Sequence, residues 1–211
     1  MMVEFMKPAL SRWPVSLRLA AARLRRDRRG STAVEFAMIV PLMLAMFFGI
    51  VEFSSGFAVK RKVSMAAEEL ADMVSRNKTV NDAAMTNFFN IGRAVMTPFS
   101  SGLLMATVTE IYIDPATGLA KSQWSQGSNA KPANTIVAVP PNLIARDPVT
   151  NAILPDQYLI FAETSYQYTA SVPYFTPTAG IPLTDQIYMR PRLSTCVFYP
   201  STPNPANCPT S

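Results

Sequence analysis

The residues of this chain that call for a chemical explanation lie close together near its start. A dense cationic cluster, Arg25-Arg26-Asp27-Arg28-Arg29, ends at Gly30, and a single carboxylate follows at Glu35, directly before Phe36. An apolar segment begins at Ser31, so Glu35 is placed inside what should be a membrane helix. An acid at the centre of a bilayer costs roughly 2.5–3.5 kcal/mol, which favours a functional role. The alternative is that Glu35 lies at the headgroup boundary and faces the last arginines of the cluster.

Charge is distributed very unevenly along the 211 residues. Residues 1–30 carry eight Lys and Arg against two acids, whereas residues 31–211 carry 11 basic and 12 acidic side chains. The sequence pI near 9.4 is therefore a property of the basic leader. Directly before an apolar span, such a leader indicates positive-inside orientation rather than nucleic-acid binding. We expect a cytoplasmic N-terminus and a C-terminal bulk on the other side of the membrane.

The apolar segment, residues 31–59, is long enough to cross a bilayer. As a helix it would extend about 43 Å, compared with a hydrocarbon core of ~30 Å. Residues 36–51 carry no charge, Glu52 then interrupts the segment, and Lys60-Arg61-Lys62 closes it. Pro41 lies inside the segment and is expected to kink or locally open the helix.

Besides a segment that loses only its basic leader, two other kinds of N-terminal segment are possible. An uncleaved anchor would keep the whole leader, and an ordinary signal peptide would lose the apolar segment. The basic region before the apolar run is long for a signal peptide, and residues 54–58 are a poor match to an A-x-A cleavage site. We therefore favour a segment that stays as a transmembrane helix.

Helix is expected to continue past the membrane. Residues 61–76 contain no Pro or Gly, and their apolar residues recur at helical spacing. A second helix is predicted over residues 81–96, and Pro98 should stop it. The predicted apolar face of the first helix consists of Val63, Ala66, Ala67, Leu70, Met73 and Val74.

The composition changes after Pro98, where prolines, β-branched residues and aromatic residues become frequent. Helix first and antiparallel strands afterwards predict an α+β fold. The predicted strands are residues 103–114, 119–126, 135–139, 157–170 and 184–198, and residues 114–118 form a tight turn between the first two. The expected division of the chain is a basic cytoplasmic leader at 1–30, a transmembrane helix at 31–59, a periplasmic helical stem at 60–97, a sheet domain at 98–198 and a Pro-rich tail at 199–211.

The two cysteines, Cys196 and Cys208, lie near the C-terminus. The chain has no His and no other Cys, so the usual zinc sites cannot form within one chain. An exported domain meets an oxidising compartment, so a disulfide between them is expected, with two free thiols as the alternative.

The residue inventory argues against an enzyme. Without His, the usual Ser-His and Cys-His nucleophile pairs cannot be built. Ser75-x-x-Lys78 fits a short nucleophile pattern but lacks the partner motifs that accompany it. Phosphate-binding glycine loops are also missing from the sequence. We expect no catalytic site, no cofactor and no metal.

Three segments together resemble the N-terminal signature of TadE-like pseudopilins of the tight-adherence (Tad) pilus, a class similar to type IV prepilins. They are Gly30-Ser31-Thr32-Ala33-Val34-Glu35-Phe36-Ala37, Val40-Pro41-Leu42 and Gly49-Ile50-Val51-Glu52-Phe53. Far downstream, Met189-Arg190-Pro191-Arg192 resembles the end of the C-terminal strand of that family. The N-terminal match spans about 25 residues, and its motifs are specific in combination.

The resemblance implies a long N-terminal helix followed by an antiparallel sheet, which is the plan of pilin-like proteins. It implies that a prepilin peptidase cuts after Gly30, that Ser31 becomes the new N-terminus, and that Glu35 neutralises the new amine of its own or a neighbouring subunit. The implied partners are that peptidase, other pilins and pseudopilins, the Tad inner-membrane platform and the lipid bilayer.

The implied function is assembly or priming of tight-adherence pili at the bacterial inner membrane for surface attachment. The alternative is an uncleaved single-pass envelope protein whose periplasmic domain is a binding module.

Overall fold

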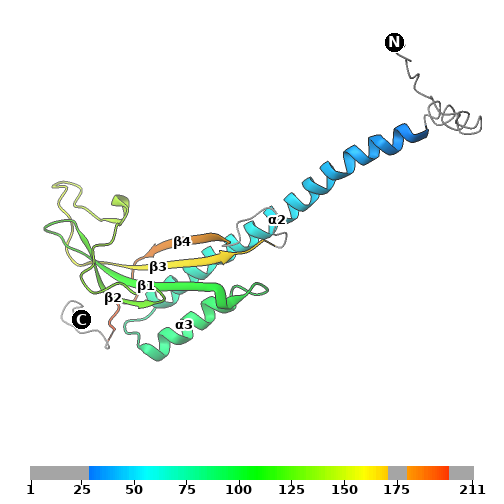
Figure 1. Ribbon diagram of the computed structural model, residues 1–211. Coiled ribbons are helices and arrows are strands. Elements are labelled where there is room, and N and C mark those ends of the chain that lie inside the picture. Colours follow the sequence, from blue (N-terminus) through cyan, green and yellow to red (C-terminus); the bar gives the residue numbers. More distant parts are fainter. Residues whose placement is uncertain (1–28, 171–179, 200–211) are drawn as a thin grey trace, which may run out of the picture. The chain divides into compact units, whose positions relative to one another are not determined.

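The structure is a computed structural model that describes residues 29–170 and 180–199. The chain forms two compact units that meet between Ile50 and Val51. The first unit contains the start of helix α2, and the second contains the rest of α2 together with all later elements (Figure 1).

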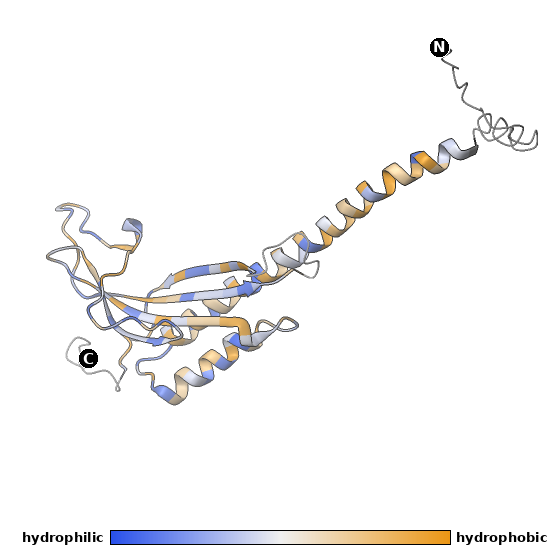
Figure 2. Ribbon diagram, in the orientation of Figure 1, coloured by the Kyte–Doolittle hydropathy of each residue, from blue (hydrophilic) through white to orange (hydrophobic). Residues whose placement is uncertain are grey.

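Helix α2, Arg29–Ser75, joins the predicted membrane helix and the predicted stem into one 47-residue element. Pro41 lies inside it, and the α-helix continues on both sides of the proline. The first part is mostly hydrophobic after Glu35, as the largely orange colouring of that stretch in Figure 2 shows.

From Val59 onward only one face of α2 is apolar. Its buried residues recur every three or four positions, which confirms the predicted amphipathic face. They are Val59, Val63, Ala66, Ala67, Leu70, Ala71 and Val74, each fully buried. Met73 of the predicted face is partly buried.

Helix α3, Asp82–Ala94, confirms the second predicted helix. Asn81 caps it, because its side-chain oxygen accepts a hydrogen bond from Ala84 N–H at 2.9 Å. Gly92 lets α3 approach α2 closely, since a Cβ at that position would lie 3.2 Å from the Leu70 side chain. The close approach places α3 beside the second part of α2.

Four antiparallel strands follow in the order β2-β1-β3-β4. Their bounds are Leu104–Ile113 for β1, Ala120–Gly127 for β2, Gln157–Tyr168 for β3 and Ile181–Met189 for β4. Short 3-10 turns stand at Ser101–Leu103 and Pro141–Leu143. The long N-terminal helix and the antiparallel sheet confirm the predicted α+β class.

Helices α2 and α3 cover the same face of the sheet. Leu70 and Val74 from α2 and Met85 from α3 pack in one buried cluster with Val108 of β1 and Ile160 of β3. The other face carries a separate cluster that includes Ile111 and Leu159, packed against residues of the β2–β3 connection.

Two strand predictions are wrong in whole or in part. Residues 135–139 form no strand; Ile136 makes only an isolated bridge to Lys121. The last strand was predicted over 184–198, but β4 ends at Met189, before Pro191, whose ring nitrogen carries no hydrogen for a ladder. Phe198 pairs instead with Thr79, in a parallel bridge.

The buried face of α2 predicts a large difference between two neighbouring substitutions. Leu70→Ala removes a fully buried side chain and should cost about 2–5 kcal/mol of unfolding free energy. Met65→Ala, at a position 47 % exposed on the opposite face, should have little effect. Urea unfolding of the detergent-solubilised protein, followed by near-UV circular dichroism, measures both. Equal losses in the two variants would contradict the assigned packing of α2.

Candidate functional site

The first turn of α2 brings together two of the predicted site residues. The Ser31 hydroxyl donates a hydrogen bond to Glu35 Oε1 at 2.9 Å, across one helical turn. Both residues and the adjacent Phe36 are exposed in the first unit. The geometry therefore places the Ser31 side chain within hydrogen-bond reach of the Glu35 carboxylate.

Gly30 is not required by the fold. A Cβ at this position would meet nothing within 4 Å, and the residue lies in helix, where glycine costs about 1 kcal/mol relative to alanine. Gly127 is the contrasting case, with a φ of +130° and a Cβ position only 2.2 Å from the Ala106 carbonyl oxygen. The chain needs glycine at 127, whereas glycine at 30 has no reason inside the described part of the chain.

The apolar stretch after Glu35 is exposed along its length. Phe36, Met38 and Leu42 are each more than 60 % exposed, and an 18-residue window of the helix reaches a mean hydropathy of 2.3 with none of it buried. A helix of this length and composition can span a membrane. Pro41 and Gly49 lie inside this stretch; a Cβ at Gly49 would also meet nothing within 4 Å.

Glu52, the second carboxylate of the apolar segment, contacts the sheet. The Tyr168 hydroxyl at the end of β3 donates to Glu52 Oε1 at 2.5 Å. Burial, together with this hydrogen bond to a carboxylate, raises the pKa of Tyr168 to about 12. The tyrosine ring also packs 3.6 Å from the position a Cβ would take on Gly56. Glu52 therefore helps to dock α2 on the sheet.

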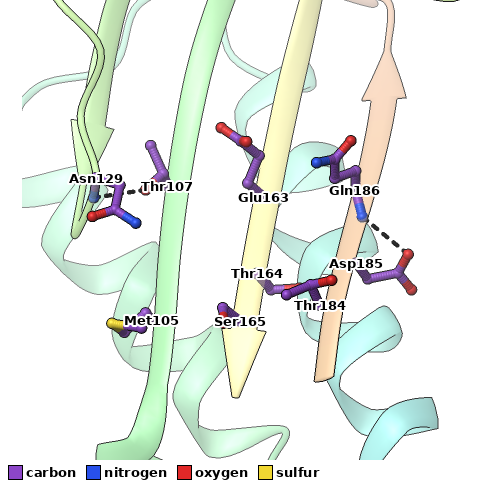
Figure 3. A pocket seen from close by; sticks show the side chains of 9 residues that line it. All are labelled: Met105, Thr107, Asn129, Glu163, Thr164, Ser165, Thr184, Asp185 and Gln186. Carbon is purple, nitrogen blue, oxygen red and sulfur yellow. Dashed lines mark hydrogen bonds between the residues drawn. The ribbon is translucent and has the colours of Figure 1, made fainter. Parts of the chain in front are cut away.

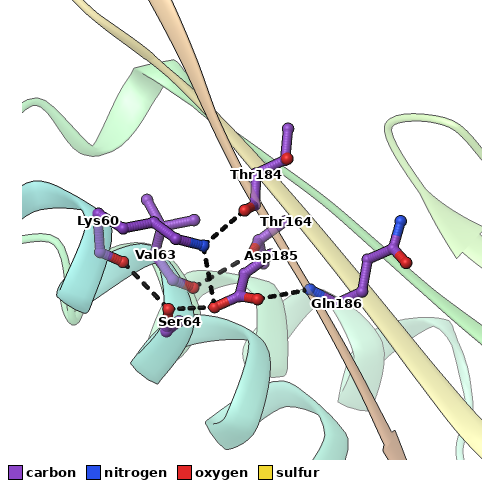
Figure 4. A network of polar contacts seen from close by, with 7 residues as sticks. All are labelled: Lys60, Val63, Ser64, Thr164, Thr184, Asp185 and Gln186. Atoms are coloured by element: carbon purple, nitrogen blue, oxygen red, sulfur yellow. Dashed lines mark hydrogen bonds and ion pairs between the residues drawn. The ribbon is translucent and has the colours of Figure 1, made fainter.

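A denser polar network lies two turns further along α2 (Figure 4). Lys60 Nζ donates to the Thr184 carbonyl oxygen at 2.6 Å and lies 3.2 Å from Asp185 Oδ2. The Ser64 hydroxyl donates to the same carboxylate oxygen. Partial burial acts to raise the pKa of Asp185, but the hydrogen bonds from Ser64, from the Gln186 N–H and from Lys60 outweigh it and lower the pKa. The network fastens α2 to the edge strand β4.

The predicted C-terminal motif lies at the other end of α2. The backbone N–H of Arg192 donates to the Ser75 carbonyl oxygen at 2.8 Å. The Arg192 guanidinium lies 2.7 Å from Asp72 Oδ1, and this ion pair does not have the geometry of a hydrogen bond. Pro191 precedes it, and Arg190 donates to the Leu143 carbonyl oxygen at 3.0 Å. Arg192 thus satisfies a terminal carbonyl of the helix and adds a positive charge near its negative end.

Strand β1 carries a buried carboxyl group that was not predicted from the sequence. Glu110 is 1 % exposed and accepts a hydrogen bond from Val197 N–H at 2.5 Å. Trp124 Nε1–H donates to the Val197 carbonyl oxygen at 2.8 Å, and the Trp124 ring stacks on Tyr199. These contacts hold the segment after β4 against the sheet. An acid among the apolar and β-branched residues of Leu104–Ile113 was the available sequence signal.

Burial raises the pKa of Glu110 to about 8, although hydrogen bonds from Val197 and Trp124 act to lower it.

Of the expected disulfide pair, Cys196 is buried, whereas Cys208 lies outside the described residues, as do Arg25 to Arg28 of the leader. Their predicted roles stay predictions. Within residues 29–170 and 180–199, no cluster of three His, Cys, Asp or Glu side chains could hold a metal.

The fold and the first turn of α2 together define a class: a protein with one N-terminal helix able to cross a membrane and an antiparallel-sheet domain. Comparison with protein families shows which family within this class the chain is similar to. Residues 30–72 match the family described as TadE-like protein, which confirms the resemblance drawn from the sequence. The match starts at Gly30 and lies wholly within α2. No curated protein and no solved structure matches the chain.

Glu110 predicts a specific dependence of stability on pH. Its ordinary pKa is 4.5 and its folded pKa is about 8, so between these values the folded state holds one more proton than the unfolded state. Stability should therefore be fully present below pH 4.5 and fall as pH rises toward 8. Glu110→Gln keeps an acceptor for Val197 N–H and should lessen this fall by about 1 kcal/mol or more.

Urea unfolding at several pH values between 5 and 8.5 measures the effect. Glu68→Gln, at an exposed carboxylate on α2, is the matched control and should keep the wild-type pH dependence. A wild-type slope in Glu110→Gln would show that Glu110 is ionised in the folded protein at neutral pH.

Proposed function

We propose that this chain is a TadE-like pseudopilin, or minor pilin, that is processed after Gly30 and acts in the assembly or priming of tight-adherence pili for surface attachment. The observation that carries the proposal is that the start of the family match and an unexplained glycine coincide at Gly30. The family match begins at this residue, and the helix has no internal need for glycine there. A requirement outside the chain, such as the narrow cleft of a peptidase, explains the glycine.

The position of Gly30 suits cleavage. It lies in the first turn of α2, where backbone N–H groups have no partner within the helix and the turn opens at low cost. Water then adds to the Gly30 carbonyl, the bond to the Ser31 nitrogen breaks, and the products are a Gly30 carboxylate and a Ser31 amine. The basic leader leaves with Gly30, and the apolar helix remains.

Cleavage creates a charge that Glu35 can neutralise. The Ser31 hydroxyl already contacts Glu35 at 2.9 Å, so the new amine on the same residue lies one turn from the carboxylate. A positive amine and a negative carboxylate in lipid are tolerable only as a pair. Pairing within one chain, or with the amine of a neighbouring subunit, gives Glu35 its role in assembly.

The proposed location follows from charge and hydropathy. The basic leader faces the cytoplasm, α2 crosses the inner membrane once, and the sheet domain lies in the periplasm. The proposed partners are the prepilin peptidase, other pilins and pseudopilins, and the Tad inner-membrane platform. An uncleaved envelope protein with a binding domain is the competing function, and the mature N-terminus distinguishes the two.

Processing is tested by mass spectrometry of the protein from native membranes, with and without the prepilin peptidase. A start at Ser31 that depends on the peptidase is expected. Gly30→Leu should leave the chain uncut, because a bulky side chain cannot enter the cleft. Gly49→Leu is the matched control, since Gly49 also lies in open space on α2, and it should be cut normally. An intact N-terminus in the wild-type protein would favour the uncleaved alternative.

Assembly is tested with Glu35→Gln. Removing one partner of a buried charge pair costs roughly 3–5 kcal/mol. Pili should therefore be lost while the protein still inserts in the membrane, as measured by electron microscopy and membrane fractionation. Glu68→Gln, on the same helix beyond the apolar segment, should assemble normally. Normal pili in Glu35→Gln would refute the proposed role of the carboxylate.

A further inference from the structure

Within the residues that the structure describes, the sheet face that points away from α2 and α3 is covered over one half only. The β2–β3 connection covers the half around Ile111 and Leu159. The other half presents two rows of cross-strand neighbours. One row contains Thr107, Glu163 and Gln186, and the next contains Met105, Ser165 and Thr184.

These two rows line a pocket of about 240 Å³ (Figure 3). Its remaining wall includes Asn129, at the start of the β2–β3 connection, whose backbone N–H donates to the Thr107 hydroxyl at 3.0 Å. In Figure 3 the helices lie behind the sheet, and the side chains of Glu163 and Gln186 stand on neighbouring strands. The pocket is therefore built mainly on strands β1, β3 and β4 of the sheet.

The pocket offers hydrogen-bonding groups that the fold does not use. Within the described part of the chain, the side chains of Asn129, Ser165, Thr184 and Gln186 make no hydrogen bond. Two of them are amides and two are hydroxyls, so together they supply both donors and acceptors. Met105, which is 40 % exposed, adds an apolar contact at one side.

The charges around the pocket are already paired. Lys131 forms an ion pair with Glu163 and also lies 5.3 Å from the centre of the Phe161 ring. The Asp185 carboxylate is held on the α2 side by Lys60 and Ser64. Burying an unpaired ion beside paired charges is unfavourable, so the pocket selects a neutral ligand with many hydrogen-bonding groups.

We propose that this pocket binds one unit of a neutral saccharide polymer. Hydroxyl and acetamido groups of a sugar match the free amides and hydroxyls, and a C–H face of the ring fits against Met105. The volume is below the ~300–1000 Å³ of pockets that enclose a whole small molecule, which suits a single unit of a longer chain. The choice of a saccharide rests on the proposed periplasmic location, where the domain meets envelope glycans.

The test uses the full-length protein in detergent and two neutral probes, chitohexaose and cellohexaose, with binding measured by isothermal titration calorimetry and saturation-transfer NMR. Binding of at least one probe is expected. Gln186→Ala and Ser165→Ala should each weaken it about fivefold, the effect of one lost hydrogen bond. Gln167→Ala is the matched control, because it removes an amide from β3 outside the pocket and should leave the affinity unchanged.

Absence of binding by both probes would overturn the proposal, as would an equal loss in Gln167→Ala. Binding of polygalacturonate in preference to the neutral probes would overturn the argument from charge. A failure of the saccharide proposal can be distinguished from a failure of the proposed function. Saccharide binding together with an intact N-terminus in native membranes would refute the pseudopilin role alone, and a native start at Ser31 without saccharide binding would refute the pocket assignment alone.

Discussion

The apolar contact between the second part of α2 and the sheet is the interaction on which the rest of this domain depends. Val63, Leu70 and Val74 are fully buried there, and the strands opposite them gain their core from the same contact. A small sheet needs a hydrophobic face packed against other elements to be stable, and α2 supplies such a cover here. Because α2 is also the element able to cross a membrane, the anchor and the core of the domain are parts of one helix.

The polar contacts along α2 fix its register on the sheet. Glu52 meets Tyr168 at the end of β3, Val63 accepts from Thr164 further back on the same strand, and Lys60 meets Asp185 on β4. The helix therefore runs antiparallel to β3. Apolar burial alone is not directional, whereas these hydrogen bonds specify one alignment.

The same contacts occupy the edge of β4. Pro182 has no N–H, the Thr184 carbonyl accepts from Lys60, and the Gln186 N–H donates to Asp185. At the other edge, β2 is bonded to the segment around Thr135. Exposed strand edges invite pairing with other chains, and proteins block them in these ways. Strand addition is therefore a poor route for partners of this domain, and the faces of the sheet and of α2 are the better candidates.

The sequence predicted the elements whose pattern is local. The apolar face of α2, the helix α3 and the strands β1, β2 and β3 follow from spacing, caps and turns, and Gly30 and Glu35 stand out by their chemistry. The contacts of Glu52, Lys60 and Glu110 were not predictable, because each partner lies more than 80 residues away along the chain. The end of β4 was mispredicted for a related reason, since Phe198 forms a bridge with Thr79 and Val197 is held by side chains of the sheet, without extending the β3–β4 ladder.

The tie between Arg192 and the end of α2 has a mechanical consequence. Tension along α2 enters the domain first at Glu52 and Lys60, which bond to β3 and β4. At the C-terminal end of α2, Arg192, which follows β4 in the chain, donates a hydrogen bond to Ser75 and forms an ion pair with Asp72. A pulling force is thus shared between attachments at both ends of the domain, so no single contact has to resist it alone.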